Sequence, residues 1–174
     1  MKKFRVGIIG CGNIFPMHAY PVMEREDTEL VAICDNKPDI MTEQSNKLGA
    51  SGYTDYIEMF ENANLDVVHL CTPHYLHPIM AIEALKRGIK VLTEKPMSIQ
   101  AADAKAMVDA SIDNKTRLGV IFQNRYNPGA KLIKSCLENG SLGKIISARA
   151  MVTWNRSDDY YALSDWKGTW EKEG

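Results

Sequence analysis

Short apolar segments rich in Val, Ile and Leu recur along the chain, separated by longer segments in which apolar residues follow helical spacing. Apolar runs without polar alternation are typical of strands that are buried on both faces of a parallel sheet. These runs predict strands at Phe4–Ile9, Leu30–Cys34, Asp66–Cys71, Lys90–Thr93 and Arg117–Phe122.

Helix signals fill the intervals between these strands. Pro38 suits a first helical turn and Gly49 a C-terminal stop, so a helix is expected over 38–48. Asp55 and Glu58 have capping-box spacing and should begin a short helix. Two further helices are expected over His77–Arg87 and Ala101–Asn114. Alternating strands and helices predict an α/β fold with a doubly wound parallel sheet and right-handed crossovers.

The pattern changes after Phe122. Asn127–Glu138 predicts a helix and Ile145–Trp154 a long strand, and a turn-rich aromatic tail follows. All three tryptophans lie between residues 154 and 170. Tryptophans gathered in a tail more often belong to an interface or a binding site than to a core. Residues 123–174 are therefore expected to form a region of their own.

Length and composition narrow the class of protein. With about 150 residues to a typical domain, 174 residues make one domain and a remainder. The net charge of −1 lacks the basic excess of nucleic-acid or anionic-membrane binders. No apolar run approaches the roughly 18 residues of a membrane span. The four cysteines show no C-x-x-C spacing and lie in apolar segments, which indicates buried, reduced thiols in a cytoplasmic protein and no metal site.

A glycine-rich turn follows the first predicted strand, where residues 10–15 read G-C-G-N-I-F. Gly10 permits a tight turn, and Gly12 lets the backbone approach a pyrophosphate at the start of the next helix. Phe15 stands at the third position of the G-x-G-x-x-G/A pattern, which weakens the match and predicts looser packing of that helix on the sheet. Two glycines at such a turn also occur for geometry alone.

An acidic residue follows the second predicted strand. Asp35 lies 25 positions after Gly10, close to the spacing of the carboxylate that binds the ribose hydroxyls of NAD. The 2′-phosphate of NADP would be repelled there by about 4 kcal/mol at 4 Å, and Lys37 could offset part of this repulsion. NAD is therefore the expected cofactor, with NADP as a second option. The alternative is that Asp35 caps the following helix.

Two later strand ends carry further candidates. Ligands of open α/β sheets bind outside the carboxyl ends of the strands. Thr72 and His77 follow the predicted strand at 66–71 and are candidate cofactor contacts. Glu94 and Lys95 follow the next strand, where a carboxylate suits ribose hydroxyls and a lysine suits acid–base chemistry. The alternative is that both are solvated surface charges.

Two histidines lie on apolar segments. His18 follows the glycine turn in a helix that Pro21 should kink or interrupt, and His69 lies on an inner strand. A lone histidine on an apolar element is more often a structural residue than a ligand, so neither is given a role.

Four motifs together resemble the glucose–fructose oxidoreductase/inositol dehydrogenase/rhizopine catabolism (Gfo/Idh/MocA) family. Residues 7–14 (G-I-I-G-C-G-N-I) are similar to the start of the family, and residues 71–77 (C-T-P-H-Y-L-H) to its T-P-N-x-x-H motif, with His74 in place of Asn. Residues 94–96 match its E-K-P motif, and residues 122–126 (F-Q-N-R-Y) resemble the opening of its second half.

The resemblance implies an NAD(P)-dependent oxidoreductase that transfers a hydride between nicotinamide and a secondary alcohol of a sugar, cyclitol or nucleotide sugar. It implies a Rossmann-type domain over 1–122 and the start of a substrate and oligomerisation domain over 123–174. Lys95 would lie near the nicotinamide and the reacting hydroxyl as the catalytic residue. The tail near Trp166 would reach the cofactor, although Lys167 stands where Arg is common. The expected cofactor contacts are Gly10, Gly12, Asn13, Ile14, Asp35, Thr72, Pro73, His77, Glu94, Lys95, Asn124 and Trp166.

The family continues into a mostly antiparallel sheet with a D-x-x-x-H motif that supplies the remaining acid–base groups. We therefore expect the chain to be a truncated front half that binds NAD but is inactive alone. Its unpaired strand at 145–154 should either pair with another copy in a homo-oligomer or leave the tail disordered. The alternative function is a non-catalytic NAD sensor or scaffold module. Methyltransferases also place glycines and an acid after their first two strands, but the E-K-P residues argue against that class.

Overall fold

The computed structural model describes residues 2–162 and 164–174, and its contacts divide the chain into two units. The first unit comprises the residues up to Ile121 together with Gly168–Gly174, and the second comprises Phe122–Lys167. The two units are described separately.

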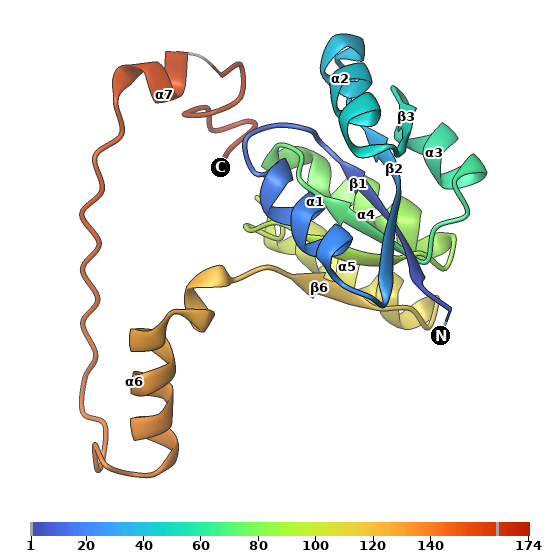
Figure 1. Cartoon of the computed structure of the whole chain (residues 1–174). Helices are drawn as coiled ribbons and strands as arrows, with labels where there is room; N and C mark the ends of the chain where they lie inside the picture. Colours follow the sequence, from blue (N-terminus) through green and yellow to red (C-terminus); the bar gives the residue numbers. More distant parts are fainter. Residues whose placement is uncertain (1, 163) are drawn as a thin grey trace. The chain divides into compact units, whose positions relative to one another are not determined.

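The first unit is built on a six-stranded sheet in the order β3-β2-β1-β4-β5-β6, in which every neighbouring pair is parallel (Figure 1). The strands are β1 (Phe4–Ile9), β2 (Thr28–Cys34), β3 (Ser51–Tyr53), β4 (Val67–Leu70), β5 (Lys90–Thr93) and β6 (Leu118–Val120). This is the doubly wound parallel sheet that the apolar runs predict. The sequence analysis did not predict β3, whose three residues include Gly52 and form no apolar run.

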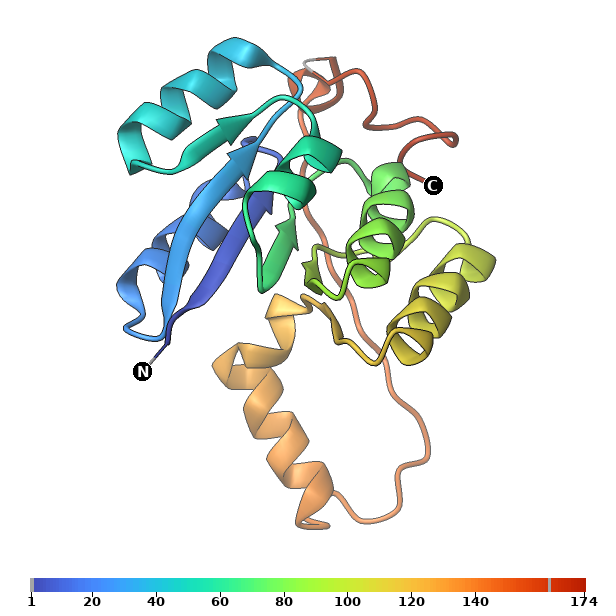
Figure 2. The same ribbon diagram turned by 90° about the vertical axis from the view of Figure 1, so that its right-hand side faces the viewer.

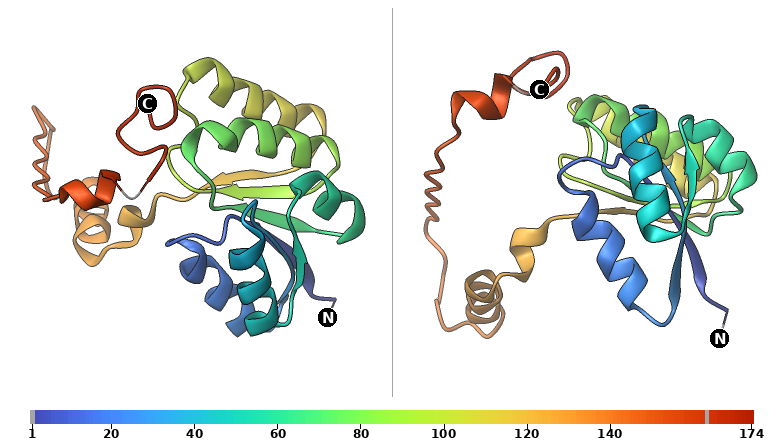
Figure 3. Two further views of the ribbon diagram at one scale, coloured as in Figure 1. Left: turned by 90° about the horizontal axis from the view of Figure 1, so that it is seen from above. Right: turned by 45° about the horizontal axis from the view of Figure 1, so that its top comes forward.

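Helices cover both faces of this sheet (Figures 2 and 3). Their bounds are α1 (Phe15–Glu24), α2 (Pro38–Leu48), α3 (Tyr56–Asn62), α4 (His77–Lys86) and α5 (Ala101–Asp113), with a 3₁₀ turn, η1, at His74–Leu76. One buried cluster joins the sheet to α1 and α2, and the other joins it to α3, α4 and α5. None of the helices in the described residues is long and apolar enough to cross a membrane.

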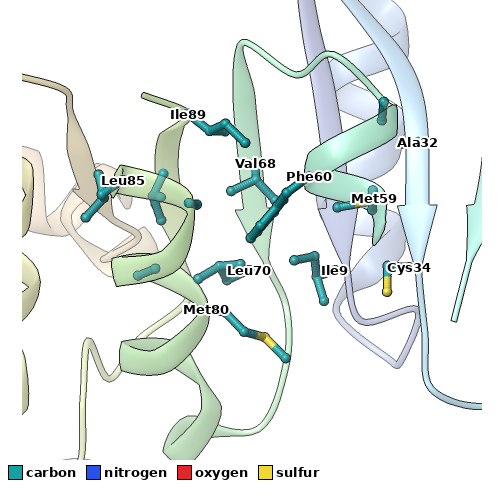
Figure 4. Packing of buried hydrophobic residues seen from close by; sticks show 14 of the residues in the cluster. Ile9, Ala32, Cys34, Met59, Phe60, Val68, Leu70, Met80, Leu85 and Ile89 are labelled. Carbon is teal, nitrogen blue, oxygen red and sulfur yellow. The ribbon is translucent and has the colours of Figure 1, made fainter. Parts of the chain in front are cut away.

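Neighbouring residues of β1 supply the two clusters. On β1, Val6 and Ile8 face the cluster that contains Phe15 of α1, whereas Ile9 faces the opposite cluster. Figure 4 shows the second cluster, in which Phe60 of α3 lies with the apolar residues of β4 and α4. Burial on both faces explains why these strands read as continuous apolar runs.

The helix α1 differs from expectation at Pro21. The helix runs unbroken to Glu24, so the predicted interruption is wrong. Burial of one face, with Ala19 and Val22 both under 5% exposed, holds the turn against the sheet although Pro21 lacks an N–H donor. Phe15 is only 2% exposed, so it fills the space between helix and sheet and the predicted looseness is also wrong.

The second unit contains the 3₁₀ turn η2 (Gln123–Tyr126) and the helices α6 (Pro128–Glu138) and α7 (Asp158–Ala162). The predicted helix at 127–138 is confirmed. The strand predicted at Ile145–Trp154 is wrong, because this segment forms no strand in the described structure. A strand exists only through hydrogen bonds to a neighbour, and no described segment pairs with this one. Its apolar side chains are exposed, Ile146 to 93%.

Candidate functional site at the carboxyl edge of the sheet

The order of the strands reverses between β1 and β4, because β2 and β3 lie beyond β1 while β5 and β6 lie beyond β4. In open α/β sheets, ligands bind outside the carboxyl ends of the strands at such a reversal. Gly10 follows β1, Asp35 follows β2, Thr72 follows β4 and Glu94 follows β5. The fold therefore brings the sequence-predicted residues of this unit to one edge.

The turn after β1 requires a glycine at position 10. Gly10 has φ +94°, a conformation that other residues rarely adopt, and a Cβ there would lie 2.7 Å from the carbonyl oxygen of Cys71. Its N–H donates to the carbonyl of Cys34 over 2.8 Å. The tight turn thus places the following loop against the ends of both β2 and β4.

The other glycine of the turn faces open space. A Cβ on Gly12 would meet nothing within 4 Å, and Asn13 and Ile14 beside it are exposed. The helix α1 begins directly afterwards and has no side-chain cap at Ile14. An exposed glycine loop at an uncapped helix N-terminus fits a pyrophosphate, which such backbones bind through N–H groups and the helix dipole.

The Asp35 carboxylate ties this loop to the end of β2. Its Oδ2 accepts a hydrogen bond from the N–H of Cys11 over 2.9 Å, and its Oδ1 accepts one from the N–H of Lys37 over 2.9 Å. The residue at the N-cap of α2 is Lys37, so the alternative that Asp35 caps this helix is not what the structure has. A carboxylate offers about four lone-pair sites, and two remain for a ligand.

His77 connects the ends of β4 and β5 from inside the protein. Its side chain is fully buried, and its Nδ1 and Nε2 lie 2.9 Å from the carbonyl oxygens of Pro96 and Thr72 respectively. Burial lowers the pKa of His77 although both carbonyl contacts oppose the shift. Both ring nitrogens face the main chain, so His77 is placed to position Thr72 and the E-K-P loop.

Glu94 and Lys95 form the corner after β5. Glu94 Oε2 accepts a hydrogen bond from the N–H of Lys95 over 3.2 Å, and Glu94 Oε1 accepts one from His18 Nε2 over 3.0 Å. Burial alone would raise the pKa of Glu94, but the hydrogen bond and charge of His18 and the neighbouring Lys95 lower it overall. Glu94 is therefore a carboxylate at neutral pH. Lys95 is exposed at the same corner.

Sequence reasoning missed the contact of His18 with this corner. His18 lies on α1, and its Nδ1 lies 3.2 Å from Nδ1 of His69 on β4. Strand alternation alone does not give this contact, because it depends on the register of the parallel neighbours β4 and β5, which sets His69 opposite Leu92. Residues 69, 92 and 94 then share one face of the sheet, and that face is the one that α1 covers.

The cysteines were predicted to be buried and reduced. All four are free thiols, and Cys11 and Cys34 are buried. Burial raises the pKa of each of these two thiols to about 12, which keeps them protonated and unreactive. Cys71 and Cys136 are half-buried, which corrects the prediction for these two. Among residues 2–162 and 164–174, no three His, Cys, Asp or Glu side chains gather around a common metal position.

Two sequence-predicted contacts lie in the second unit. Asn124 is part of η2, where its Oδ1 accepts a hydrogen bond from Asn127 Nδ2 over 3.4 Å. Trp166 lies in a turn, and Nζ of Lys167 is 5.9 Å from the centre of its ring and 3.9 Å from that of Tyr160. Their roles in cofactor binding remain predictions.

Known oxidoreductases are similar in sequence to this chain. Residues 4–122 match the sequence profile of the Gfo/Idh/MocA family, described as an oxidoreductase family with an NAD-binding Rossmann fold. The chain is 33% identical to myo-inositol 2-dehydrogenase of Thermotoga maritima, over 80% of this chain and 42% of that protein. It is 34% identical to D-glucoside 3-dehydrogenase of Escherichia coli, over 86% of this chain and 44% of that protein. The chain spans about half the length of these relatives.

Solved structures of dehydrogenases also match the chain. The WlbA dehydrogenase of Chromobacterium violaceum, in complex with NADH and UDP-GlcNAcA, has a TM-score of 0.97 and 34% identity over 100% of this chain and 51% of that one. The WlbA dehydrogenase of Bordetella pertussis, with the same two ligands, has a TM-score of 0.93 and 36% identity over 99% and 50%. The myo-inositol 2-dehydrogenase of Lactobacillus plantarum matches 83% of this chain and 44% of that one, with a TM-score of 0.77 and 29% identity.

Proposed function

Because this chain belongs to the Gfo/Idh/MocA family of NAD-binding oxidoreductases, we propose that it forms the cofactor-binding half of an NAD-dependent dehydrogenase acting on a secondary alcohol. The observation that carries this proposal is the meeting of the glycine turn, Asp35 and the Glu94–Lys95 corner at one edge of the sheet. If Asp35 only capped a helix, or if Glu94 and Lys95 were only solvated surface charges, nothing would explain why these residues meet at one edge of the sheet.

The residues at this edge fit the parts of a dinucleotide. Gly10 and Gly12, with Asn13 and Ile14 beside them, would hold the pyrophosphate, and the free lone pairs of Asp35 would accept from the adenosine ribose. Thr72, Pro73 and Glu94 would line the nicotinamide half, with His77 holding their loops. NAD supplies the hydride acceptor of the oxidation, which the side chains of this chain lack.

Lys95 is the residue we assign to proton transfer. It lies at the carboxyl end of β5, is exposed, and follows a carboxylate that is held in place through both oxygens. The neutral amine of a lysine at this position would take the hydroxyl proton when the alcohol is oxidised, and the resulting ammonium would return it in the reverse reaction. Such acid–base groups contribute about 10²–10⁴-fold to rate.

Among possible substrates, we favour a nucleotide sugar that carries a carboxylate. The two WlbA dehydrogenases, crystallised with UDP-GlcNAcA, match 99–100% of this chain with TM-scores of 0.93–0.97. The inositol dehydrogenase structure matches 83% with a TM-score of 0.77. The similarity to the WlbA proteins thus extends over the second unit, which is where the family places its substrate domain.

Turnover and binding together test the proposal. The protein from the reading frame that contains this chain should reduce NAD when given UDP-N-acetylglucosaminuronic acid, and should do so at least about tenfold more efficiently than with myo-inositol. Lys95→Met should lower kcat by about 10²–10⁴ while NADH still binds in a calorimetric titration. A protein that binds NADH but does not reduce NAD with any of the sugars offered would instead be a sensor module. Wild-type turnover in Lys95→Met would contradict the role of the lysine.

A further inference from the structure

Three titratable side chains from three elements form a continuous hydrogen-bonded array beneath the E-K-P loop. His69 of β4 contacts His18 of α1 through their Nδ1 atoms at 3.2 Å, and Nε2 of His18 donates to Oε1 of Glu94 at 3.0 Å. The two rings meet edge to face, with centroids 5.3 Å apart. The side chain of His18 is 3% exposed and that of Glu94 13%, so the array lies largely out of water.

The chemistry of the array fixes where its protons lie. Glu94 is ionised and only accepts, so Nε2 of His18 carries a proton. When His18 is neutral, its Nδ1 is a lone pair, and His69 must donate from Nδ1. When His18 is protonated, its Nδ1 donates, and His69 must accept there and carry its proton on Nε2. The low pKa of His69, about 4 because of burial and then the neighbouring His18, keeps that ring neutral in both cases.

His69 can therefore change tautomer without breaking a hydrogen bond in the array. It borders a cavity of about 680 Å³ on the same face of the sheet, which offers a route for proton exchange with solvent. The bond from His18 to Glu94 persists in either state. An ordinary structural histidine on an apolar face would be satisfied by one main-chain partner and would not be tied to a carboxylate at the candidate site.

We propose that His18 and His69 are positioning residues for Glu94: His18 fixes the orientation of the carboxylate beside Lys95, and His69 holds the His18 ring in place by pairing with its Nδ1 in either protonation state. This inference rests on the proposed function, because the groups that an oriented Glu94 carboxylate would bind are the hydroxyls of the nicotinamide ribose. One Glu94 oxygen is occupied by His18 and the other by the Lys95 N–H, so the remaining lone pairs have fixed directions.

Binding of NADH to the full chain tests this role through matched substitutions at position 18. His18→Leu removes the donor and should raise the Kd for NADH about tenfold, as loss of a hydrogen bond to a charged group does. His18→Gln keeps an amide N–H near the position of Nε2 and should remain within about threefold of wild type. Glu94→Gln should weaken binding as much as His18→Leu, and the double variant no further, because both act through one carboxylate.

The exposed neighbour Met17 on the same helix supplies the control. Met17→Leu should leave the Kd unchanged, and circular dichroism should show that all variants keep the wild-type helix content. In ¹⁵N spectra of the histidine rings, Glu94→Gln should move the signals of both His18 and His69, since both belong to one array.

The outcomes separate this inference from the proposed function. If wild type binds NADH and a folded His18→Leu binds it equally well, the positioning role is overturned and the proposed function stands. If the ring signals of His18 do not respond to Glu94→Gln, the array does not exist in solution and the inference is likewise overturned. If wild type itself binds no NADH, the proposed function is overturned, and the cofactor role of the array with it.

Discussion

At the scale of single residues, the Asp35 carboxylate illustrates how one side chain serves structure and proposed binding together. It accepts hydrogen bonds from the N–H groups of Cys11 and Lys37 and so holds the glycine turn against the end of β2. The same carboxylate faces the position where the cofactor ribose is proposed to bind. A negative charge there opposes a second phosphate, which is the physical basis for expecting NAD rather than NADP.

Asp35→Asn tests this expectation, because the amide keeps one oxygen acceptor but removes the charge. We expect the ratio of NADPH Kd to NADH Kd to fall by at least about tenfold, and calorimetric titration with both cofactors measures it. Asp39→Asn removes an exposed acid from the first turn of α2 and should leave the ratio unchanged. Tighter binding of NADPH than NADH by wild type would contradict the assignment.

His69 gives stability a pH dependence of known sign. Burial lowers its pKa from 6.5 to about 4, so below pH 6.5 the unfolded chain binds more protons at this residue than the folded chain does. Its contribution to the free energy of unfolding is therefore complete at pH 7 and falls as the pH decreases, by about 2 kcal/mol at pH 5.

Urea unfolding of wild type and His69→Asn at pH 7 and pH 5 measures this term. Asn keeps an amide near Nδ1 but does not titrate, so the loss of stability between the two pH values should be about 2 kcal/mol smaller in the variant. An equal loss in both proteins would mean that His69 takes up its proton in the folded state as easily as in the unfolded chain.

At the scale of elements, the turn between β1 and α1 depends on one backbone conformation. Gly10→Ala would place a Cβ 2.7 Å from the carbonyl oxygen of Cys71, at a residue whose φ is +94°. Either the segment that follows β4 would have to shift or the turn would have to adopt another conformation. We expect a loss of at least about 2 kcal/mol in the free energy of unfolding, measured by urea denaturation. Unchanged stability would show that the turn adopts another conformation.

Elements specified by local chemistry could be predicted from the sequence. Asp55 accepts a hydrogen bond from the N–H of Ile57 over 2.7 Å and begins α3, and Gly49 ends α2 with φ +69°. Elements that depend on distant partners could not. The short edge strand β3 exists only because β2 lies beside it, and the apolar run at 145–154 finds no partner among the described residues.

The candidate site also contains residues that could be predicted from the sequence and residues that could not. The positions of Gly10, Asp35 and Lys95 at one edge were predictable because each lies within two residues of the end of an apolar run, and parallel strands bring such positions together. His18 was not, because its role depends on the register that sets His69 opposite Leu92 and on α1 lying over that face. His77 was predicted as a cofactor contact, which stays a prediction, and the structure places both of its nitrogens against main-chain carbonyls.

At the scale of the whole molecule, the central proposal is that the carboxyl edge of the first unit binds NAD. We expect this chain to bind NAD although it spans about half the length of its relatives. Every group proposed to hold the pyrophosphate and the adenosine ribose lies before residue 36. The second unit adds exposed aromatic residues such as Trp154, which is 69% exposed.

Gly12 allows the most direct test, because a Cβ there meets no protein atom within 4 Å and would intrude only on a bound ligand. Gly129 in α6 is equally open and supplies the matched control in the other unit. The measurement is calorimetric titration of NADH into wild type, Gly12→Val and Gly129→Val. We predict one NADH per chain for wild type and Gly129→Val. For a Gly12→Val protein of unchanged thermal stability, we predict an affinity for NADH about a hundredfold lower, a loss of about 2.8 kcal/mol in binding free energy. Equal NADH affinity in Gly12→Val and wild type would contradict the central proposal.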